Sequence, residues 1–282
     1  MKPMKKWCMP LIMAMILPAF FGCALTSDHS RHYSTSIVEY LYPDKKEPID
    51  KPEIPVLSLP LRAGIAFVPT NSGYQALSER EKTDLLNTVR NHFKKFEFIK
   101  SIDVIPSAYL TPKGSFSNLD QIATMFGIDV IALVSYDQKQ FTDQGVASIT
   151  YWTIVGAYII PGEKNSVHTM LDTAVYDIRS RKMLFRAPGL SHIRSLSTPV
   201  NQSEQIRKDS AEGFKQASVQ MIENLQTQLE EFKVKVRESP QEVQIVHRTG
   251  YKGGGYFDEL FLAIALLAGA FHARNRLQQR KR

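Results

Sequence analysis

The order of apolar and amphipathic segments between residues 61 and 236 constrains the fold of this chain most strongly. Apolar runs rich in β-branched residues are typical of buried strands, and they occupy residues 61–69, 101–106, 128–139 and 147–161. Helical periodicity marks residues 77–96, 118–127 and 201–236. Residues 167–189 alternate on both sides of a polar turn at 179–182 and predict a β-hairpin. This order predicts an α/β (α+β) domain with a mixed β-sheet flanked by helices.

Local signals support the three predicted helices. Ser78 followed by Glu81 forms a capping box at the start of the first helix, and Gly127 is placed to end the second. One face of the third helix is apolar, through Phe214, Ala217, Met221, Leu225, Leu229 and Phe232. Each helix therefore has one face that can pack on a sheet.

The body resembles known bacterial envelope domains. Its strand–helix–strand–helix opening, the apolar strand "GIDVIALVSY" and the hairpin "VYDIRSRKMLFR" look like the periplasmic domain of the curli-secretion lipoprotein. They are also similar to the N-terminal module of the Tol-system propeller protein. The resemblance implies that residues 61–236 form a periplasmic domain.

The positive charge of the chain lies at its two ends. The full 282 residues carry a net charge of +7, of which residues 1–22 and 256–282 contribute +3 each, so residues 23–255 carry +1. A body with so little excess charge cannot hold a phosphate backbone, and we therefore expect no nucleic-acid partner. The only cysteines are Cys8 and Cys23, which excludes a disulfide framework or a cysteine metal site in the body.

The first 22 residues have the pattern of a lipoprotein signal peptide. A basic "MKPMKKW" precedes the apolar "CMPLIMAMILPAFF", and Gly22-Cys23 follows. Gly22-Cys23 resembles a lipobox, which implies cleavage between the two residues and lipidation of Cys23. A diacylglycerol and an N-acyl chain such as palmitate would anchor the protein stably. Ala24 at the next position implies sorting to the outer membrane. A plain signal peptide with an incidental cysteine, or an uncleaved signal anchor, is the alternative.

Residues 23–60 are expected to form a tether between this anchor and the domain. Five prolines lie between residues 43 and 60, and proline favours an extended, semi-rigid chain. Such a spacer would lift the domain away from the bilayer.

The C-terminal 46 residues have three parts. A polar linker, 237–255, ends in Gly253, Gly254 and Gly255, and residues 256–282 follow with an apolar run from Leu260 to Phe271. Five basic residues and no acidic one close the chain, namely Arg274, Arg276, Arg280, Lys281 and Arg282. The run is shorter than the ~20 residues of an ordinary span, so a core or interfacial helix is an alternative. The one-sided basic flank nevertheless predicts a single transmembrane helix with its C-terminal end in the cytoplasm.

This tail resembles the GlyGly-CTERM sorting signal of Gram-negative bacteria. With the lipobox, it makes the chain similar to the rhombotarget (rhombotail) lipoproteins. The resemblance implies processing near Gly253–Gly255 by rhombosortase, a rhomboid-type intramembrane serine protease. Glycine costs about 1 kcal/mol in a helix relative to alanine, so three in a row keep the cleaved segment unwound. The expected partners are lipoprotein processing and sorting machinery, this protease and membrane lipid. A bitopic protein that retains its C-terminal helix is the alternative.

No pattern in the body predicts catalysis, a metal site or a cofactor. The seven histidines show no metalloprotease spacing, and Ser191 beside His192 lacks a nucleophile elbow. Asp172 and Asp177 are five positions apart, an odd spacing that puts them on opposite strand faces. Tyr151, Trp152 and Tyr158 suit either a core or a binding groove. We expect a non-enzymatic envelope lipoprotein that binds an unknown envelope partner from the periplasm or the cell surface. A hydrolase using Ser191 and His192 is the remaining alternative.

Overall fold

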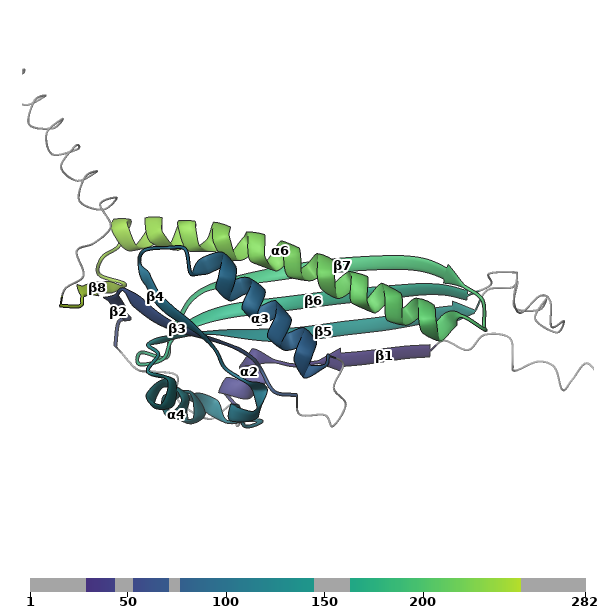
Figure 1. Ribbon diagram of the computed structural model, residues 1–282, viewed down its shortest axis with the longest axis horizontal. Coiled ribbons are helices and arrows are strands. Elements are labelled where there is room, and N and C mark those ends of the chain that lie inside the picture. Colours follow the sequence, from purple (N-terminus) through teal and green to yellow (C-terminus); the bar gives the residue numbers. More distant parts are fainter. Residues whose placement is uncertain (1–28, 44–52, 71–76, 145–162, 250–282) are drawn as a thin grey trace, which may run out of the picture. The chain divides into compact units, whose positions relative to one another are not determined.

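The computed structural model describes residues 29–43, 53–70, 77–144 and 163–249 (Figure 1). Strands and helices alternate along most of this length. In chain order they are β1 (His29–Ser34), α2 (Ile37–Leu41), β2 (Val56–Leu59), β3 (Leu61–Phe67), α3 (Glu79–Phe93), β4 (Ile99–Val104), the 3₁₀ turn η2 (Ser107–Tyr109), α4 (Ser115–Phe126), β5 (Val130–Gln144), β6 (Glu163–Asp177), β7 (Met183–Ser197), α6 (Gln202–Glu238) and β8 (Gln244–His247).

The described residues fall into two compact units. Unit 1 contains residues 29–34, 136–144, 163–172 and 188–223. Unit 2 contains residues 35–43, 53–70, 77–135, 173–187 and 224–249. Strands β5, β6 and β7 and helix α6 each contribute residues to both units.

Unit 2 has a parallel arrangement around β3. This strand lies between β4 and β5 and is parallel to both, with Ile65 opposite Val104 on one side and Ala132 on the other. Parallel neighbours need long crossover connections, which α3 and α4 supply. A separate two-stranded sheet pairs β2 with β8 in parallel, from Val56 opposite Gln244 to Leu59 opposite His247.

Both faces of β3 and β5 are buried within unit 2. One face packs against α2 and α4 in a core that includes Leu41, Phe116, Leu119, Ile131 and Leu133. Alternate residues, such as Ile65 and Phe67, are equally buried, and α3 and the later part of α6 supply buried leucines of their own. Helices α2 and α4 contact each other and lie close together in Figure 1. Burial on both faces explains why these strands read as continuous apolar runs.

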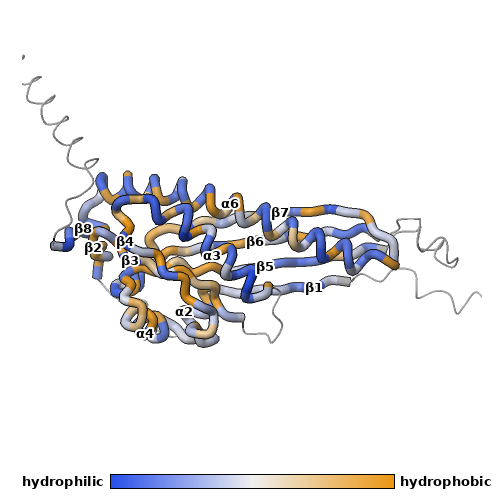
Figure 2. Tube along the Cα trace, in the orientation of Figure 1, coloured by the Kyte–Doolittle hydropathy of each residue, from blue (hydrophilic) through white to orange (hydrophobic). Residues whose placement is uncertain are grey.

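Unit 1 has antiparallel strand pairing and a more polar interior. Strand β1 pairs antiparallel with β5, from His29 opposite Thr142 to Ser34 opposite Asp137. The side chains of Gln138 and Thr169 are 2% exposed, and the Gln138 amide donates to Thr169 Oγ1 at 3.0 Å. Figure 2 shows this contrast, with β3 largely hydrophobic and β1 and the later part of β5 largely polar. A polar interior of this kind is stable only when its groups are hydrogen-bonded.

The mixed sheet flanked by helices is confirmed, and so are several local predictions. Ser78 and Glu81 form a reciprocal capping box at α3. Gly127 ends α4 in the left-handed conformation, with φ of 65°. A turn follows β6 at Ile178 and precedes β7, as the hairpin prediction requires. No helix in the described part of the chain is long and apolar enough to span a membrane.

Some elements were not predicted. The expected tether, 23–60, contains β1, α2 and β2, and the expected linker, 237–255, contains β8. Strand β1 is "HSRHYS", which has no apolar alternation, and its pairing with the polar half of β5 is a backbone interaction. Among the described strands, β2 pairs with β8 alone, far away in sequence. The strand expected at 147–161 lies outside the described residues, as do the signal peptide and the C-terminal helix.

Candidate binding surface on the outer face of unit 1

Four polar side chains gather on one face of the unit 1 sheet. Ser166 and His168 come from β6, and His192 and Arg194 come from β7. Within each strand the two residues are separated by one position, so they point to the same face. The two histidines and Arg194 are exposed, whereas the intervening Val167 is fully buried.

The two imidazole rings are stacked and share one hydroxyl. Their centroids lie 3.9 Å apart with an angle of 19° between the ring planes. Ser166 Oγ lies 3.2 Å from His168 Nε2 and 2.9 Å from His192 Nε2. Phe141 of β5 meets the His168 ring edge-on, with the centroids 6.0 Å apart. We call these five residues the histidine surface: Phe141, Ser166, His168, His192 and Arg194.

The surroundings of His192 favour its neutral form. Loss of hydration lowers the pKa of His192, and the positive charges that His168 and Arg194 can carry lower it further. Arg194 Nε donates to His192 Nε2 at 3.2 Å, which requires an unprotonated nitrogen there. Protonation of His192 is therefore disfavoured, and Arg194 supplies a guanidinium beside the two stacked rings.

The chemistry of the histidine surface suits binding. A hydroxyl, imidazole nitrogens and a guanidinium can hydrogen-bond a polar or acidic partner, and the ring stack offers a flat apolar contact. Within the described residues, no group of three His, Cys, Asp or Glu side chains gathers to hold a metal ion. Ser166 and His192 have the spacing of a nucleophile and its base, but the lowered pKa of His192 is opposite to what an orienting carboxylate would produce.

The structure separates the serine and histidine that the sequence placed side by side. Ser191 Oγ donates to Gln216 Oε1 of α6 at 2.9 Å, whereas His192 belongs to the histidine surface. Neighbouring residues in a strand point to opposite faces, so Ser191 and His192 do not form a pair. Asp177 ends β6 at the turn, where its carboxylate accepts the backbone N–H of Ser180 at 2.9 Å.

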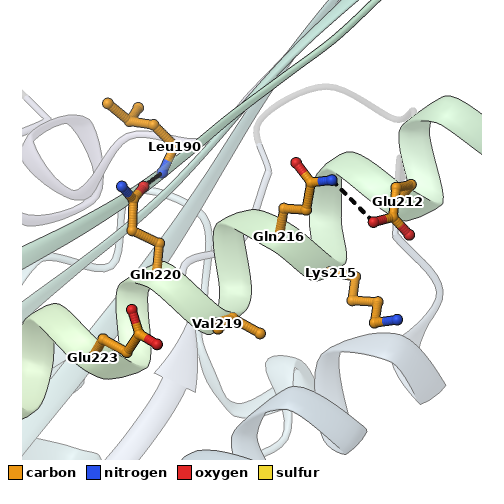
Figure 3. A pocket seen from close by; sticks show the side chains of 7 residues that line it. All are labelled: Leu190, Glu212, Lys215, Gln216, Val219, Gln220 and Glu223. Carbon is orange, nitrogen blue, oxygen red and sulfur yellow. Dashed lines mark hydrogen bonds between the residues drawn. The ribbon is translucent and has the colours of Figure 1, made fainter.

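A shallow groove runs between the edge strand β7 and α6 in unit 1 (Figure 3). It is lined by Leu190, Glu212, Lys215, Gln216, Val219, Gln220 and Glu223. The side chain of Gln220 points to Leu190 and accepts its backbone N–H, and Gln216 donates to Glu212 at 3.0 Å. An edge strand exposes unpaired backbone groups, and here the helix caps one of them. The groove thus has a structural role, protecting the edge of the sheet.

The remaining predicted residues lie outside the described part of the chain. They are Gly22, Cys23, Tyr151, Trp152, Tyr158, Gly253, Gly254, Gly255, the run from Leu260 to Phe271, and Arg274, Arg276, Arg280, Lys281 and Arg282.

The sequence did contain a signal for the histidine surface. His168 lies nine residues before the end of β6 at Asp177, and His192 lies nine residues after the start of β7 at Met183. Positions equally far from a hairpin turn face each other across the strands. Because both histidines lie nine residues from the hairpin turn, the hairpin alone predicts that they are neighbours.

Comparison with known proteins assigns the chain to no family. No family model matches the chain, and no curated protein matches it. A solved structure of a neuraminyllactose-binding hemagglutinin homolog from Helicobacter pylori is similar over 63% of this chain and 90% of its own, with 12% identity and a TM-score of 0.35. Similarity at that TM-score supports no statement about fold or function.

Proposed function

We propose that this protein is a non-enzymatic envelope lipoprotein of a Gram-negative bacterium, lipidated at Cys23 and processed near Gly253–Gly255 by a rhombosortase-type protease. Mature protein would be held by lipid at the outer membrane, with its domain in the periplasm or at the surface. The domain would bind an envelope protein through the histidine surface.

The three-part C-terminal arrangement together with the lipobox carries this proposal. Triglycine, a short apolar run and a basic end stand in the order that a sorting signal needs. The described fold is compatible with two cleavages. Its first strand begins six residues after Cys23, and its last strand ends at His247, six residues before Gly253. Both proposed cleavage regions therefore leave every described element whole.

Arg248, which lies five residues before Gly253, fixes the end of the body to unit 2 through two interactions. Arg248 donates to the Asp129 carboxylate, and its backbone N–H donates to the carbonyl of Leu59 at 2.8 Å. Strand β8 is thus tied to unit 2 independently of the residues that follow. Removal of the tail would release the protein from its second anchor without unfolding unit 2.

The intact mass of membrane-extracted protein tests both modifications in one measurement. We expect the mass of a chain that begins at Cys23 with three acyl chains and ends within Gly253–Gly255. Cys23→Ser should abolish acylation, whereas Cys8→Ser, within the signal peptide, should leave the mature mass unchanged. A mass that fits the unmodified 282 residues would refute both modifications.

A C-terminal affinity tag separates processing from the bitopic alternative. We expect the tag to be absent from mature protein, and to persist when Gly253, Gly254 and Gly255 are all replaced by alanine, because alanine allows the helix to extend over the cleaved segment. Gly250→Ala is the matched control and should not block processing. A tag retained on the mature wild-type protein would favour the bitopic alternative.

A further inference from the structure

The histidine surface lies on a sheet face that no described helix of unit 1 covers. Helix α6 packs on the opposite face, where the Gln138 amide donates to the carbonyl of Ser210 at 3.4 Å. Successive strand residues point to opposite faces, so Lys139 of β5 points away from the helix, as Phe141 does two residues later. Lys139 is exposed. This open face therefore carries a second cation besides Arg194.

The register of β5 against β6 places Lys139 next to the stacked imidazoles. Two side-chain contacts define this register, namely Gln138 with Thr169 at 3.0 Å and Thr142 with Asn165 at 3.1 Å. From the first contact to the second, the chain advances four residues along β5 and goes back four along β6, so the two strands are antiparallel. Lys139 is then opposite His168, which stacks on His192 of the next strand.

Lys139 and Arg194 both keep donors that no described residue uses. Arg194 Nε donates to His192 Nε2 at 3.2 Å, but its two Nη nitrogens have no hydrogen-bond partner among the described residues. Lys139 likewise forms no ion pair within the described part of the chain. A guanidinium with both Nη nitrogens available can bind a carboxylate through two hydrogen bonds.

The acidic side chains of this face lie at its margins. Asp137 Oδ2 is 2.9 Å from His32 Nε2. The register sets Asp143 opposite Lys164, and both side chains are exposed. Asp172 is four residues from the histidine of β6, about 13 Å along the strand. The middle of the face is therefore positively charged, which complements an anionic partner.

The separation of the two cations suits a partner with more than one carboxylate. Lys139 lies two strands across and two residues along from Arg194, so their Cα atoms are about 12 Å apart. In an extended peptide, residues four apart point to the same side and are about 13 Å apart. An extended acidic segment can thus present one carboxylate to each cation.

We infer that the histidine surface, together with Lys139, binds an extended acidic segment of a partner protein. Arg194 holds one carboxylate through its two Nη nitrogens, and Lys139 holds a second. The stacked imidazoles and the Phe141 ring contact the peptide between them. This inference rests on the binding role proposed above and adds the chemistry of the partner.

Two labelled peptides test this inference. One alternates glutamate with serine over eight residues, and the other has glutamine at each glutamate position. Fluorescence anisotropy with the full chain, purified in detergent, measures their affinities. We expect the glutamate peptide to bind about tenfold more tightly or better at an ionic strength of about 0.01 M. The difference should shrink at about 0.15 M, because the Debye length falls from about 30 Å to about 8 Å.

Three substitutions of a cation by glutamine locate the binding site. Arg194→Gln and Lys139→Gln should each weaken binding of the glutamate peptide about three- to fivefold. Lys215→Gln is the matched control, because Lys215 is an exposed cation on α6, which packs on the opposite sheet face. It should leave the affinity unchanged.

The outcomes separate this inference from the proposed function. Equal affinity for the two peptides, or equal weakening by all three substitutions, would overturn the acidic partner. If the glutamine peptide binds as well and His192→Ala weakens it, the histidine surface still binds protein as proposed. If His192→Ala weakens neither peptide, the proposed binding role fails too. Binding of polygalacturonate in place of the glutamate peptide would replace the protein partner by an acidic glycan.

Discussion

At the scale of single residues, Asp129 of unit 2 forms ion pairs with two arginines, Arg62 and Arg248. Arg62 Nη2 donates to Asp129 Oδ1 at 2.9 Å and Arg62 Nε to Oδ2 at 3.2 Å, while Arg248 donates to Oδ2 from beyond β8. Burial raises the pKa of Asp129, but the hydrogen bond from Arg62 and the charges of both arginines outweigh it, so the pKa lies below its usual value. One carboxylate therefore joins the starts of β3 and β5 to the chain after β8.

Asp129→Asn is expected to destabilise the protein by about 2 kcal/mol at pH 7, because two partly buried guanidinium groups lose their counter-charge. The contribution of Asp129 is fully present above the unfolded pKa of 3.8 and is lost as the pH falls through the lower folded pKa. Urea unfolding at pH 7 and pH 3 should therefore show a difference between wild type and variant that shrinks on acidification.

Asp120→Asn is the matched control for this experiment. The side chain of Asp120 is 54% exposed, and its Oδ2 lies 3.8 Å from Arg181 Nη2. Loss of this ion pair should lower the free energy of unfolding by less than about 0.5 kcal/mol. Equal destabilisation by the two substitutions at pH 7 would contradict the role given to Asp129.

At the scale of elements, the close approach of α6 to β7 depends on one glycine. A Cβ atom at Gly189 would lie 2.7 Å from the backbone nitrogen of Met221 and would also collide with the carbonyl oxygen of Ala217. Ala217 and Met221 are fully buried at this contact. The helix can lie this near to the strand only because position 189 has no side chain.

Gly189→Ala should therefore destabilise the protein by about 1–3 kcal/mol, because backbone atoms of α6 would have to move. Thermal unfolding measures the loss. Leu190→Thr changes the neighbouring side chain, which is 58% exposed, and should shift the stability by no more than about 0.5 kcal/mol. A Gly189→Ala protein as stable as the wild type would show that α6 is not held against β7 in this way.

At the scale of the whole molecule, two strands distant in sequence pair with each other. Strand β2 near the start of the body pairs with β8 near its end, and Leu57 and Val243 are buried there, at 3% and 7% exposure. This closure makes the residues just before the proposed cleavage region part of the folded body.

A chain from Ala24 to Lys252 should therefore unfold at the same urea concentration as one that ends at Gly255. A chain from Ala24 to Pro240 loses β8, Val243 and Arg248 together and should be less stable by roughly 3 kcal/mol or more. Urea unfolding of the three chains provides the measurement. Comparable stability of the two shorter chains would show that β8 is dispensable.

Most of the secondary structure could be predicted from local sequence. The capping box at Ser78, the terminating Gly127 and the apolar runs of β3 and β5 act through neighbouring residues, so a window of sequence contains the whole signal. Strands β1, β2 and β8 could not be predicted this way. Their residues have weak intrinsic preference, and pairing partners more than a hundred residues away stabilise them.

By itself, the sequence indicated most of the strands and helices between residues 61 and 236, the position of the charges along the chain, and the two terminal patterns on which the proposed lipidation and processing rest. These properties depend on composition and on residues close together in the chain. Only the tertiary structure decided that His168 and His192 stack beside Ser166, that Ser191 and His192 diverge, and that a strand starting six residues after Cys23 pairs with β5. Strand register and long-range pairing set these relations, because a strand's partner is chosen by the packing of the whole sheet.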